Sequence, residues 1–158
     1  MVILLQMQLL HKQRLRRGFM SQFSSNFNAV DRYLRRYRRE YMAPLGLKGI
    51  HARLFMAICR TPGCSQDQLA KRMWFDKSTI ARQMELLEKK GFITRKPSET
   101  DRRVMCVYPT EAMLQIQPDL KNAMENWEDT LLQDLTEEEK KTLVELLARV
   151  RGRVDKEA

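Results

Sequence analysis

The stretch between Ser65 and Tyr108 constrains the fold of this 158-residue chain more than any other part. Ser65 and Gln68 have the spacing of a capping box, in which two side chains satisfy free amides at the start of a helix. Asp76 is a second N-cap, and the helix that it begins ends at Gly91. Two short helices are therefore expected to meet at a tight turn. Their buried faces are predicted to hold Leu69, Ala70, Met73, Ile80, Met84 and Leu87.

The residues after Gly91 favour two β-strands, Phe92 to Lys96 and Val104 to Tyr108, and the polar sequence PSETDRR separates them. The simplest structure for this pattern is an antiparallel hairpin with a charged tip, which is called the wing here. In a winged helix-turn-helix, the second helix fits the major groove of DNA and the wing reaches the neighbouring minor groove. We therefore expect a mainly α fold with a small β-hairpin wing.

The charge of the chain is distributed unevenly. Its 29 Lys and Arg residues exceed its 20 Asp and Glu residues, for a formal net charge of +9. Residues 1–60 alone carry a net charge of +10, whereas residues 111–158 carry −5. This basic segment favours a polyanionic partner, although solvated helix surfaces are the simplest explanation for any single run of arginines. The arginines between Arg32 and Arg39 are interpreted as such a surface.

A long helix is expected before this domain. From Phe23 onward, apolar residues recur at steps of four and three, which is typical of a helix with one buried stripe: Phe23, Phe27, Val30, Leu34, Tyr37 and Tyr41. Pro44 and Gly46 end this helix. A further helix, from Lys48 to Arg60, is predicted to stop at the turn that follows it.

Long helices are also expected after the wing. Thr110 is predicted to cap a helix that reaches Leu132, with a kink at Pro118. Thr136 and Glu139 form another capping box, and the helix that they begin is predicted to bury Leu143, Leu146, Leu147 and Val150. These apolar stripes are longer than one small winged domain needs. A second chain is a reasonable place to bury them, and a core within the chain is the alternative.

Residues 1–19 are expected to form either an additional amphipathic helix or a poorly ordered extension. Their apolar run MVILLQMQLL is too short to span a bilayer, and its basic cluster follows it, which is the wrong order for a secretory signal. Cys59, Cys64 and Cys106 form no C-x-x-C pair, which favours a reducing compartment. We therefore expect a cytoplasmic protein without a membrane partner.

The chain resembles the MarR family of bacterial regulators. The resemblance is carried by LAKRM at residues 69–73, DKSTIARQMELLEKKGFITRK at residues 76–96 and DRRVMCVYPTE at residues 101–111, and it extends from Phe23 to Val150. It implies an obligate homodimer that binds a palindromic site on double-stranded DNA. The expected division is an uncertain segment at 1–19, a dimerisation helix at 20–47, a winged helix-turn-helix DNA-binding domain at 48–109 and C-terminal dimerisation helices at 110–158.

The predicted DNA-binding residues are Ser65, Gln66, Lys77, Ser78, Thr79, Arg82, Arg95, Lys96, Asp101, Arg102 and Arg103. By the resemblance, the residues that would face bases and phosphates are Lys77, Ser78, Thr79 and Arg82. Arg103 would enter the minor groove. A carboxylate makes little sense as a phosphate contact, so Asp101 is expected to pair with Arg82 or Arg103. Gln83 and Leu86 depart from the family pattern, which has an apolar residue at the first position and Arg or Lys at the second.

The function expected from these features is that of a sequence-specific DNA-binding transcriptional regulator. The resemblance implies a repressor that a small-molecule effector releases from DNA. Residues that could form an aromatic wall with a polar or cationic contact for a small aromatic or anionic effector are Tyr33, Tyr37, Tyr41, His51 and Arg53. The simpler alternative is that tyrosines at helical spacing belong to the core.

Two other binding functions stay open, and no enzyme is expected. Cys64 lies beside the short strand that would pair with the wing, and Cys106 lies on the wing itself, so a redox-sensing repressor is one alternative. Small buried cysteines on strands are, however, usually apolar filler. A winged-helix module that binds protein is the other. The chain has only two histidines, no Gly-rich phosphate loop and no nucleophile beside a base. His51, Cys59 and Cys64 lack the spacing of a zinc site, so neither a metal nor a cofactor is expected.

Overall fold

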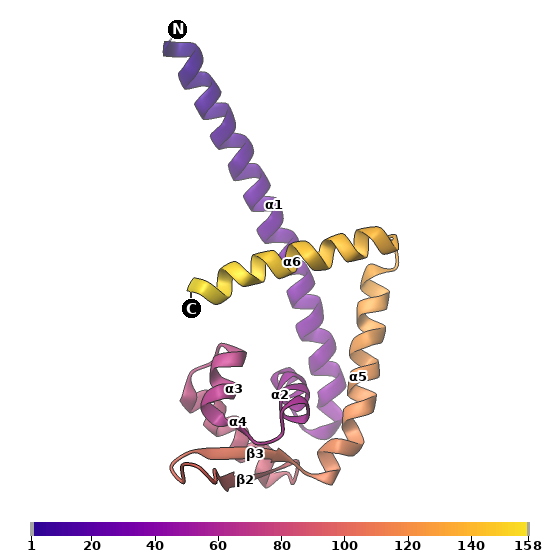
Figure 1. Ribbon diagram of the computed structural model, residues 1–158. Helices are drawn as coiled ribbons and strands as arrows, with labels where there is room; N and C mark the ends of the chain where they lie inside the picture. The colour runs from indigo at the N-terminus through magenta and orange to yellow at the C-terminus, as the bar shows by residue number, and fades with distance from the viewer. Residues whose placement is uncertain (1, 158) are drawn as a thin grey trace.

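The computed structural model describes the backbone of residues 2–157 and the side chains of residues 21–155. Its elements are α1 (Val2–Met42), η1 (Ala43–Leu45), α2 (Gly49–Arg60), β1 (Cys64–Ser65), α3 (Gln66–Met73), α4 (Lys77–Lys89), β2 (Ile93–Pro97), β3 (Met105–Pro109), α5 (Glu111–Leu132) and α6 (Glu137–Glu157). The strands form one antiparallel sheet in the order β1–β3–β2. This arrangement confirms the predicted fold class (Figure 1). Within the described residues, no helix is both long and apolar enough to cross a membrane.

Helix α1 is continuous from Val2 to Met42, so its backbone has no break near residue 20. Its first half extends away from the rest of the molecule, whereas its second half packs on α2 (Figure 1). The helix ends where Pro44 lacks an amide hydrogen and Gly46 adopts a φ of 65°, which residues with a Cβ rarely adopt. Residue 1 and the side chains of residues 2–20 lie outside the described residues, and so does the predicted amphipathic pattern of that segment.

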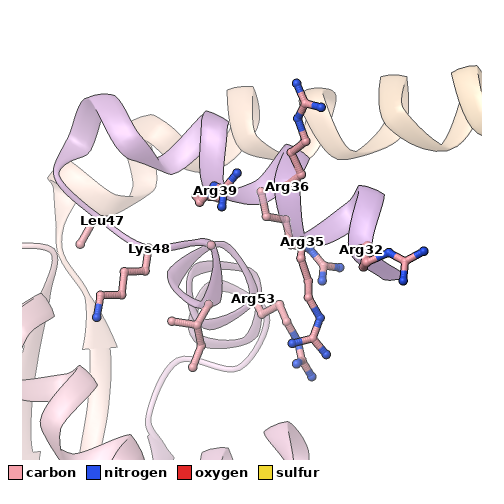
Figure 2. A pocket seen from close by; sticks show the side chains of 10 residues that line it. Arg32, Arg35, Arg36, Arg39, Leu47, Lys48 and Arg53 are labelled. Carbon is pink, nitrogen blue, oxygen red and sulfur yellow. The ribbon is translucent and has the colours of Figure 1, made fainter. Parts of the chain in front are cut away.

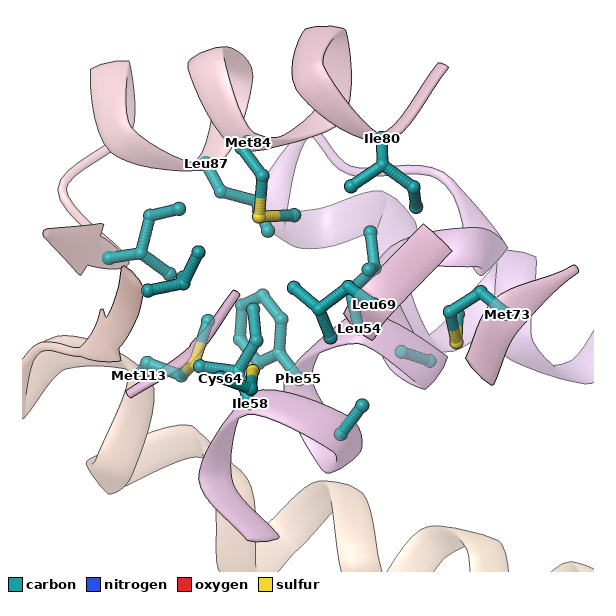
Figure 3. Packing of buried hydrophobic residues seen from close by; sticks show 14 of the residues in the cluster. Leu54, Phe55, Ile58, Cys64, Leu69, Met73, Ile80, Met84, Leu87 and Met113 are labelled. Carbon is teal, nitrogen blue, oxygen red and sulfur yellow. The ribbon is translucent and has the colours of Figure 1, made fainter. Parts of the chain in front are cut away.

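The core of the winged domain, residues 48–109, lies between α2, α3, α4 and the sheet (Figure 3). The ring of Phe55 is fully buried and lies 5.2 Å from that of Phe92. The predicted apolar faces supply this core, and its members that are at most 1% exposed include Leu54, Phe55, Ile58, Leu69, Ile80, Met84, Leu87 and Ile93. Burial of each large side chain stabilises the fold by about 1.5–3 kcal/mol. The two helices of the helix-turn-helix are thus held on one hydrophobic centre.

Of the two caps predicted for the C-terminal helices, the structure contains the one at the start of α6 but not the one at the start of α5. The hydroxyl of Thr110 donates to the carbonyl of Gly91 at 2.6 Å and caps no amide of α5, so it ties the start of this helix to the turn between α4 and β2. Helix α5 continues through Pro118. The predicted capping box of α6 is present: the amide of Thr136 donates to Glu139 at 2.9 Å, and its hydroxyl accepts from the amide of Glu139 at 3.3 Å.

Helix α6 leaves most of its apolar residues exposed to solvent. Of the four that were predicted to be buried, Leu143 is half-buried, whereas Leu146, Leu147 and Val150 are between 45% and 51% exposed. The prediction is therefore wrong for a single chain, because no other described element packs extensively against α6. The first part of the described α1 face is also uncovered, and its exposed apolar residues are Phe23, Phe27, Val30 and Tyr33.

Candidate nucleic-acid interface

Helix α4 begins at the predicted N-cap, Asp76. Its carboxylate accepts hydrogen bonds from the hydroxyl of Ser78 at 2.6 Å and from the hydroxyl and amide of Thr79, both at 2.7 Å. These bonds, with that from Ser78 the strongest, hold the pKa of Asp76 well below its ordinary value. The charged carboxylate therefore stabilises the positive end of α4 and fixes two hydroxyl side chains of the predicted DNA-binding set.

The face of α4 opposite the core carries cations. Arg82 is exposed there, and its Nη2 donates to the hydroxyl of Thr79 at 3.3 Å. Lys77, at the start of the helix, forms a 2.7 Å ion pair with Asp67 of α3. Both partners of that pair are more than half exposed, so its contribution is about 0–1 kcal/mol and Lys77 can exchange the carboxylate for another anion at little cost.

Helix α3 begins with the capping box predicted from sequence. The amide of Ser65 donates to the side-chain oxygen of Gln68 at 2.8 Å, and the amide of Gln68 donates to the hydroxyl of Ser65 at 3.1 Å. Because Ser65 also lies on β1, this box ties the start of α3 to the sheet. Gln66, the other residue predicted here, is the first residue of α3 and is half-buried.

The tip of the wing holds Asp101 in a way that differs from the prediction. Its carboxylate accepts from the backbone amide of Arg103 at 2.9 Å, and its carbonyl accepts from the amide of Val104 at 2.9 Å. Among the described residues, Asp101 forms no ion pair with Arg82 or Arg103, so it shapes the turn instead of orienting a guanidinium. A short aspartate side chain commonly bonds the amide two residues on. Arg102 and Arg103 remain exposed at the tip.

The base of the wing is joined to α4 by Arg95 and Glu88. The Nε of Arg95 donates to the carboxylate at 2.9 Å, its Nη2 donates to the same oxygen, and its backbone amide donates to the second oxygen at 3.2 Å. The side chain of Arg95 is only 22% exposed, so it holds β2 against α4. Lys96 points to the other face of the strand, with its Nζ 5.9 Å from the centre of the Tyr108 ring.

The tyrosines of the predicted effector pocket lie in helix packing. The ring of Tyr33 stacks on that of Trp127 with 6.3 Å between centres, and the hydroxyl of Tyr37 donates to the carbonyl of Ala123 at 3.0 Å. Both contacts join α1 to α5. Tyr41 is half-buried against the core of the winged domain. This arrangement agrees with the simpler alternative, in which the tyrosines serve packing.

His51, also predicted for that pocket, is completely buried at the start of α2. Its Nδ1 accepts from the backbone amide of Lys48 at 2.8 Å, whereas its Nε2 makes no hydrogen bond within the described residues. Burial lowers the pKa of His51, and the backbone of Lys48 and the nearby side chain of Gln83 oppose that shift.

Arg53, the fifth residue of that set, lines a groove of about 710 Å³ between α1 and α2 (Figure 2). We call it the α1–α2 groove, and its lining residues are Arg32, Arg35, Arg36, Arg38, Arg39, Leu47, Lys48, Gly49, Ile50 and Arg53. The sequence pattern indicated only a solvated arginine surface on α1. The groove depends on how α2 packs against α1, which helical spacing does not report.

Cys64 and Cys106 point to opposite sides of the sheet. Cys64 lies opposite Val107, and Cys106 lies opposite Ser65. Because successive strand residues alternate between faces, the side chain of Cys64 shares its face with Val107 and not with Cys106. Burial raises the pKa of Cys64, which lowers its thiolate content. These features do not favour a redox switch that links the two residues.

Known proteins match the sequence over the winged domain. The model of the MarR family matches residues 45–104. The HTH-type transcriptional regulator YybA of Bacillus subtilis (strain 168) is 34% identical over 100 residues, which cover 63% of this chain and 67% of YybA. Matched stretches span 58–67% of the length of three of the curated relatives.

Solved structures match over most of the fold. A crystal structure of MarR has a TM-score of 0.75 and 30% identity, and the match covers 83% of this chain and 89% of that protein. A MarR family transcriptional regulator from Listeria monocytogenes, complexed with 26mer DNA, has a TM-score of 0.79 and 23% identity over 84% of this chain and 88% of that protein. At 23% identity, the match to the Listeria monocytogenes protein shows similarity of fold alone. By sequence and by fold, this chain belongs to the MarR family of winged-helix transcriptional regulators, which are not enzymes.

Proposed function

We propose that this protein is a homodimeric repressor that binds a palindromic operator on double-stranded DNA in the cytoplasm. The observation that carries the proposal is the exposed face of α4, where Lys77 and Arg82 lie in its first half, opposite a buried apolar face and beside the arginine-tipped wing. The DNA bound to the Listeria monocytogenes neighbour supports the same use of this fold. Membership of a family of regulators supports the regulatory role.

In this proposal the first turns of α4 enter the major groove. Arg82 can form two hydrogen bonds to a guanine edge, a contact that discriminates bases by about 1–3 kcal/mol. Ser78 and Thr79, held by Asp76, stand at the positive end of the helix, where phosphate is favoured. Lys77 adds a salt-dependent phosphate contact.

The wing supplies the second set of contacts. Arg102 and Arg103 are exposed at a tip whose shape Asp101 fixes, so Arg103 can reach the narrow minor groove beside the site of α4. Arg95 acts indirectly in this proposal, because its bonds to Glu88 set the angle between the wing and α4. A wing held at a fixed angle keeps both grooves in register.

The proposed dimer is supported by the uncovered apolar residues of α1 and α6. Contiguous exposed apolar surface is uncommon on monomers, and a second copy of the chain could cover it by a two-fold symmetric contact. Two winged domains related by such an axis would bind half-sites about 34 Å apart, or one turn of DNA.

The test is selection of bound sequences from random DNA with the purified protein, followed by titration of the selected site with variants. We expect a palindromic site, and we expect Arg82→Ala and Arg103→Ala to weaken its binding at least about tenfold, the loss of one charge-assisted contact each. Arg149→Ala, an exposed arginine of α6, is the matched control and should bind normally. Unchanged binding by both variants would refute the assignment of these residues.

Measuring DNA binding at two salt concentrations distinguishes a DNA-binding regulator from a module that binds protein. A DNA-binding protein should lose affinity steeply between about 50 and 200 mM salt, whereas a protein-binding module should select no sequence at either concentration. The repressor role is tested with a reporter under the selected site. Expression should rise when the protein is removed, and a fall would make it an activator.

A further inference from the structure

We propose that the α1–α2 groove binds a small polyanion that carries two or more phosphoryl groups. The groove has a volume of about 710 Å³, which lies in the range of small-molecule sites. Seven of its ten lining residues are arginine or lysine. Figure 2 shows Arg35 and Arg53 reaching from α1 and α2 toward the same side, whereas Arg36 points away. One helix alone would not create this convergence of cations.

Among the described residues, ion pairs engage only two of the cations that line the groove. Asp31 forms a 2.7 Å ion pair with Arg35, and Glu40 forms a 2.8 Å ion pair with Arg36. Neither acid lines the groove. Among the described residues, the other cations of the groove form no ion pair within 4 Å; these are Arg32, Arg38, Arg39, Lys48 and Arg53. The groove therefore keeps a strong positive potential that an anion would satisfy.

The cations also repel one another. Arg38 is half-buried between the two helices, and burial, followed by the charge of Arg53, lowers its pKa. Guanidinium groups are costly to desolvate without a partner, and they bind phosphate oxygens in a two-pronged geometry. A bound phosphoryl group would turn this repulsion into attraction.

The start of α2 adds a second source of positive potential at the same place. No acidic residue lies in its first turn, although acids are favoured there. Gly49 brings this end close to α1, because a Cβ at that position would lie 3.1 Å from the backbone nitrogen of Arg39 and 3.4 Å from the carbonyl of Arg35. Lys48, Gly49 and Ile50 all line the groove, so the positive end of α2 lies at its wall.

The lining chemistry selects the class of ligand. No lining residue is aromatic, and Leu47 and Ile50 are the large apolar ones, so a small aromatic acid would find little surface to stack on. Tyr33 and Tyr37 are engaged with α5 instead. Duplex DNA is the poorer candidate, because the proposed DNA contacts lie on α4 and the wing. A compact, highly charged anion fits both the volume and the charge.

Occupancy of the groove is expected to change DNA affinity, and this step rests on the proposed function. Helix α1 belongs to the proposed dimer contact, whereas α2 belongs to the winged domain, so an anion held by both would bias their relative position. A ligand shifts such an equilibrium only by its difference in affinity for the two arrangements. The binding step itself needs no DNA.

The test is isothermal titration calorimetry of the full chain with inorganic triphosphate, without DNA. We expect saturable binding of one triphosphate per chain. The double variant Arg39→Gln/Arg53→Gln should bind at least about tenfold more weakly, since it removes two guanidinium groups that can donate charge-assisted hydrogen bonds to the anion. The matched control is Lys141→Gln/Arg149→Gln, which removes two exposed charges of α6 and should bind as the unchanged protein does. Sodium benzoate at the same ionic strength should give no saturable heat.

Several results would overturn the proposal. Absence of saturable binding, equal weakening in both double variants, or tighter binding of benzoate than of triphosphate would each do so. If the groove variant weakened DNA binding without triphosphate and reduced its salt dependence, the groove would be a DNA contact. If the same variant changed the monomer–dimer equilibrium, an acidic segment of a second copy would be the occupant. Because calorimetry contains no DNA, failure of the proposed regulator function would leave the binding result intact.

Discussion

The winged domain and the helices that flank it differ in how completely a single chain buries their apolar side chains. In the winged domain, Phe55, Leu87 and Val107 are all 0% exposed. On the flanking helices, Phe27 is 56% exposed and Val144 is 62% exposed. The first region has several elements packed around one centre, whereas within the described residues no helix packs extensively on the apolar face of α6. The core of the winged domain, to which Met42 of α1 and Met113 and Leu120 of α5 also belong, is therefore complete within one chain, whereas α6 and the first part of the described α1 leave apolar side chains exposed.

Because of this difference in burial, the two regions should contribute to different processes, the winged domain to folding and the exposed faces of α1 and α6 to association. The hydrophobic core that stabilises the winged domain is present within one chain, so its stability should depend little on protein concentration. The exposed apolar residues of α1 and α6 contribute only when they are covered, so their effect should appear as concentration-dependent association. Variants in the two regions can test this comparison.

The largest effect is expected in the core. Phe55→Ala removes a fully buried ring that packs on Phe92, and it should lower the free energy of unfolding by about 3–5 kcal/mol. Urea unfolding at several protein concentrations measures this loss. A loss below about 1 kcal/mol would mean that the winged domain can collapse around the cavity and is less tightly packed than its burial indicates.

A smaller and different effect is expected on α6. Leu146→Glu should raise the dissociation constant of the dimer at least about tenfold, because a carboxylate covered by an apolar partner loses its hydration. Sedimentation equilibrium measures the constant, and circular dichroism should show that the fold is retained. Ala148→Glu places the same charge on an exposed position of the same helix and should have little effect. If both variants had the same dissociation constant, the apolar face of α6 would not be part of the dimer contact.

The smallest effect is expected at the contact between α4 and the wing. Glu88→Gln should lower the stability by about 0.2–1 kcal/mol, since the pair with Arg95 is partly exposed. The hydrogen bond from Arg95 lowers the pKa of Glu88, so this contribution should be present above the ordinary glutamate pKa of about 4.3 and be lost as the pH falls below it. Urea unfolding between pH 3 and pH 7 should show the difference between the two proteins shrink with acidity. A difference that grows in acid would contradict the role of this pair.

Features that depend on residues close in sequence could be predicted. The bonds of Ser65 with Gln68, and of Asp76 with Thr79, join residues three apart, so the spacing alone identifies them. The buried face of α4 was predictable for the same reason, because 3.6-residue periodicity places its apolar residues on one side. The exposed position of Arg82 follows from that periodicity.

Features that depend on packing between distant segments could not be predicted. Arg95 and Arg103 look alike in the sequence, but Arg95 bonds to Glu88 of α4 whereas Arg103 stays in solvent. From the sequence, Tyr37 was equally suited to a pocket and to the core. Its hydrogen bond to the carbonyl of Ala123 shows that it joins α1 to α5. Residue type and periodicity indicate which side of a helix or strand is apolar. They do not indicate which other helix or strand packs against that side.

The sequence by itself determined the helix-turn-helix, its caps, its hairpin wing and its family, because these depend on short-range spacing and on local backbone preferences. Only the tertiary structure decided which cations are engaged and which are free, that the apolar face of α6 is uncovered, and that the arginines of α1 form the wall of a groove with the start of α2. The physical reason is that charge and burial act between neighbours in space, and the packing of α1 against α2 makes neighbours of residues that the chain keeps apart.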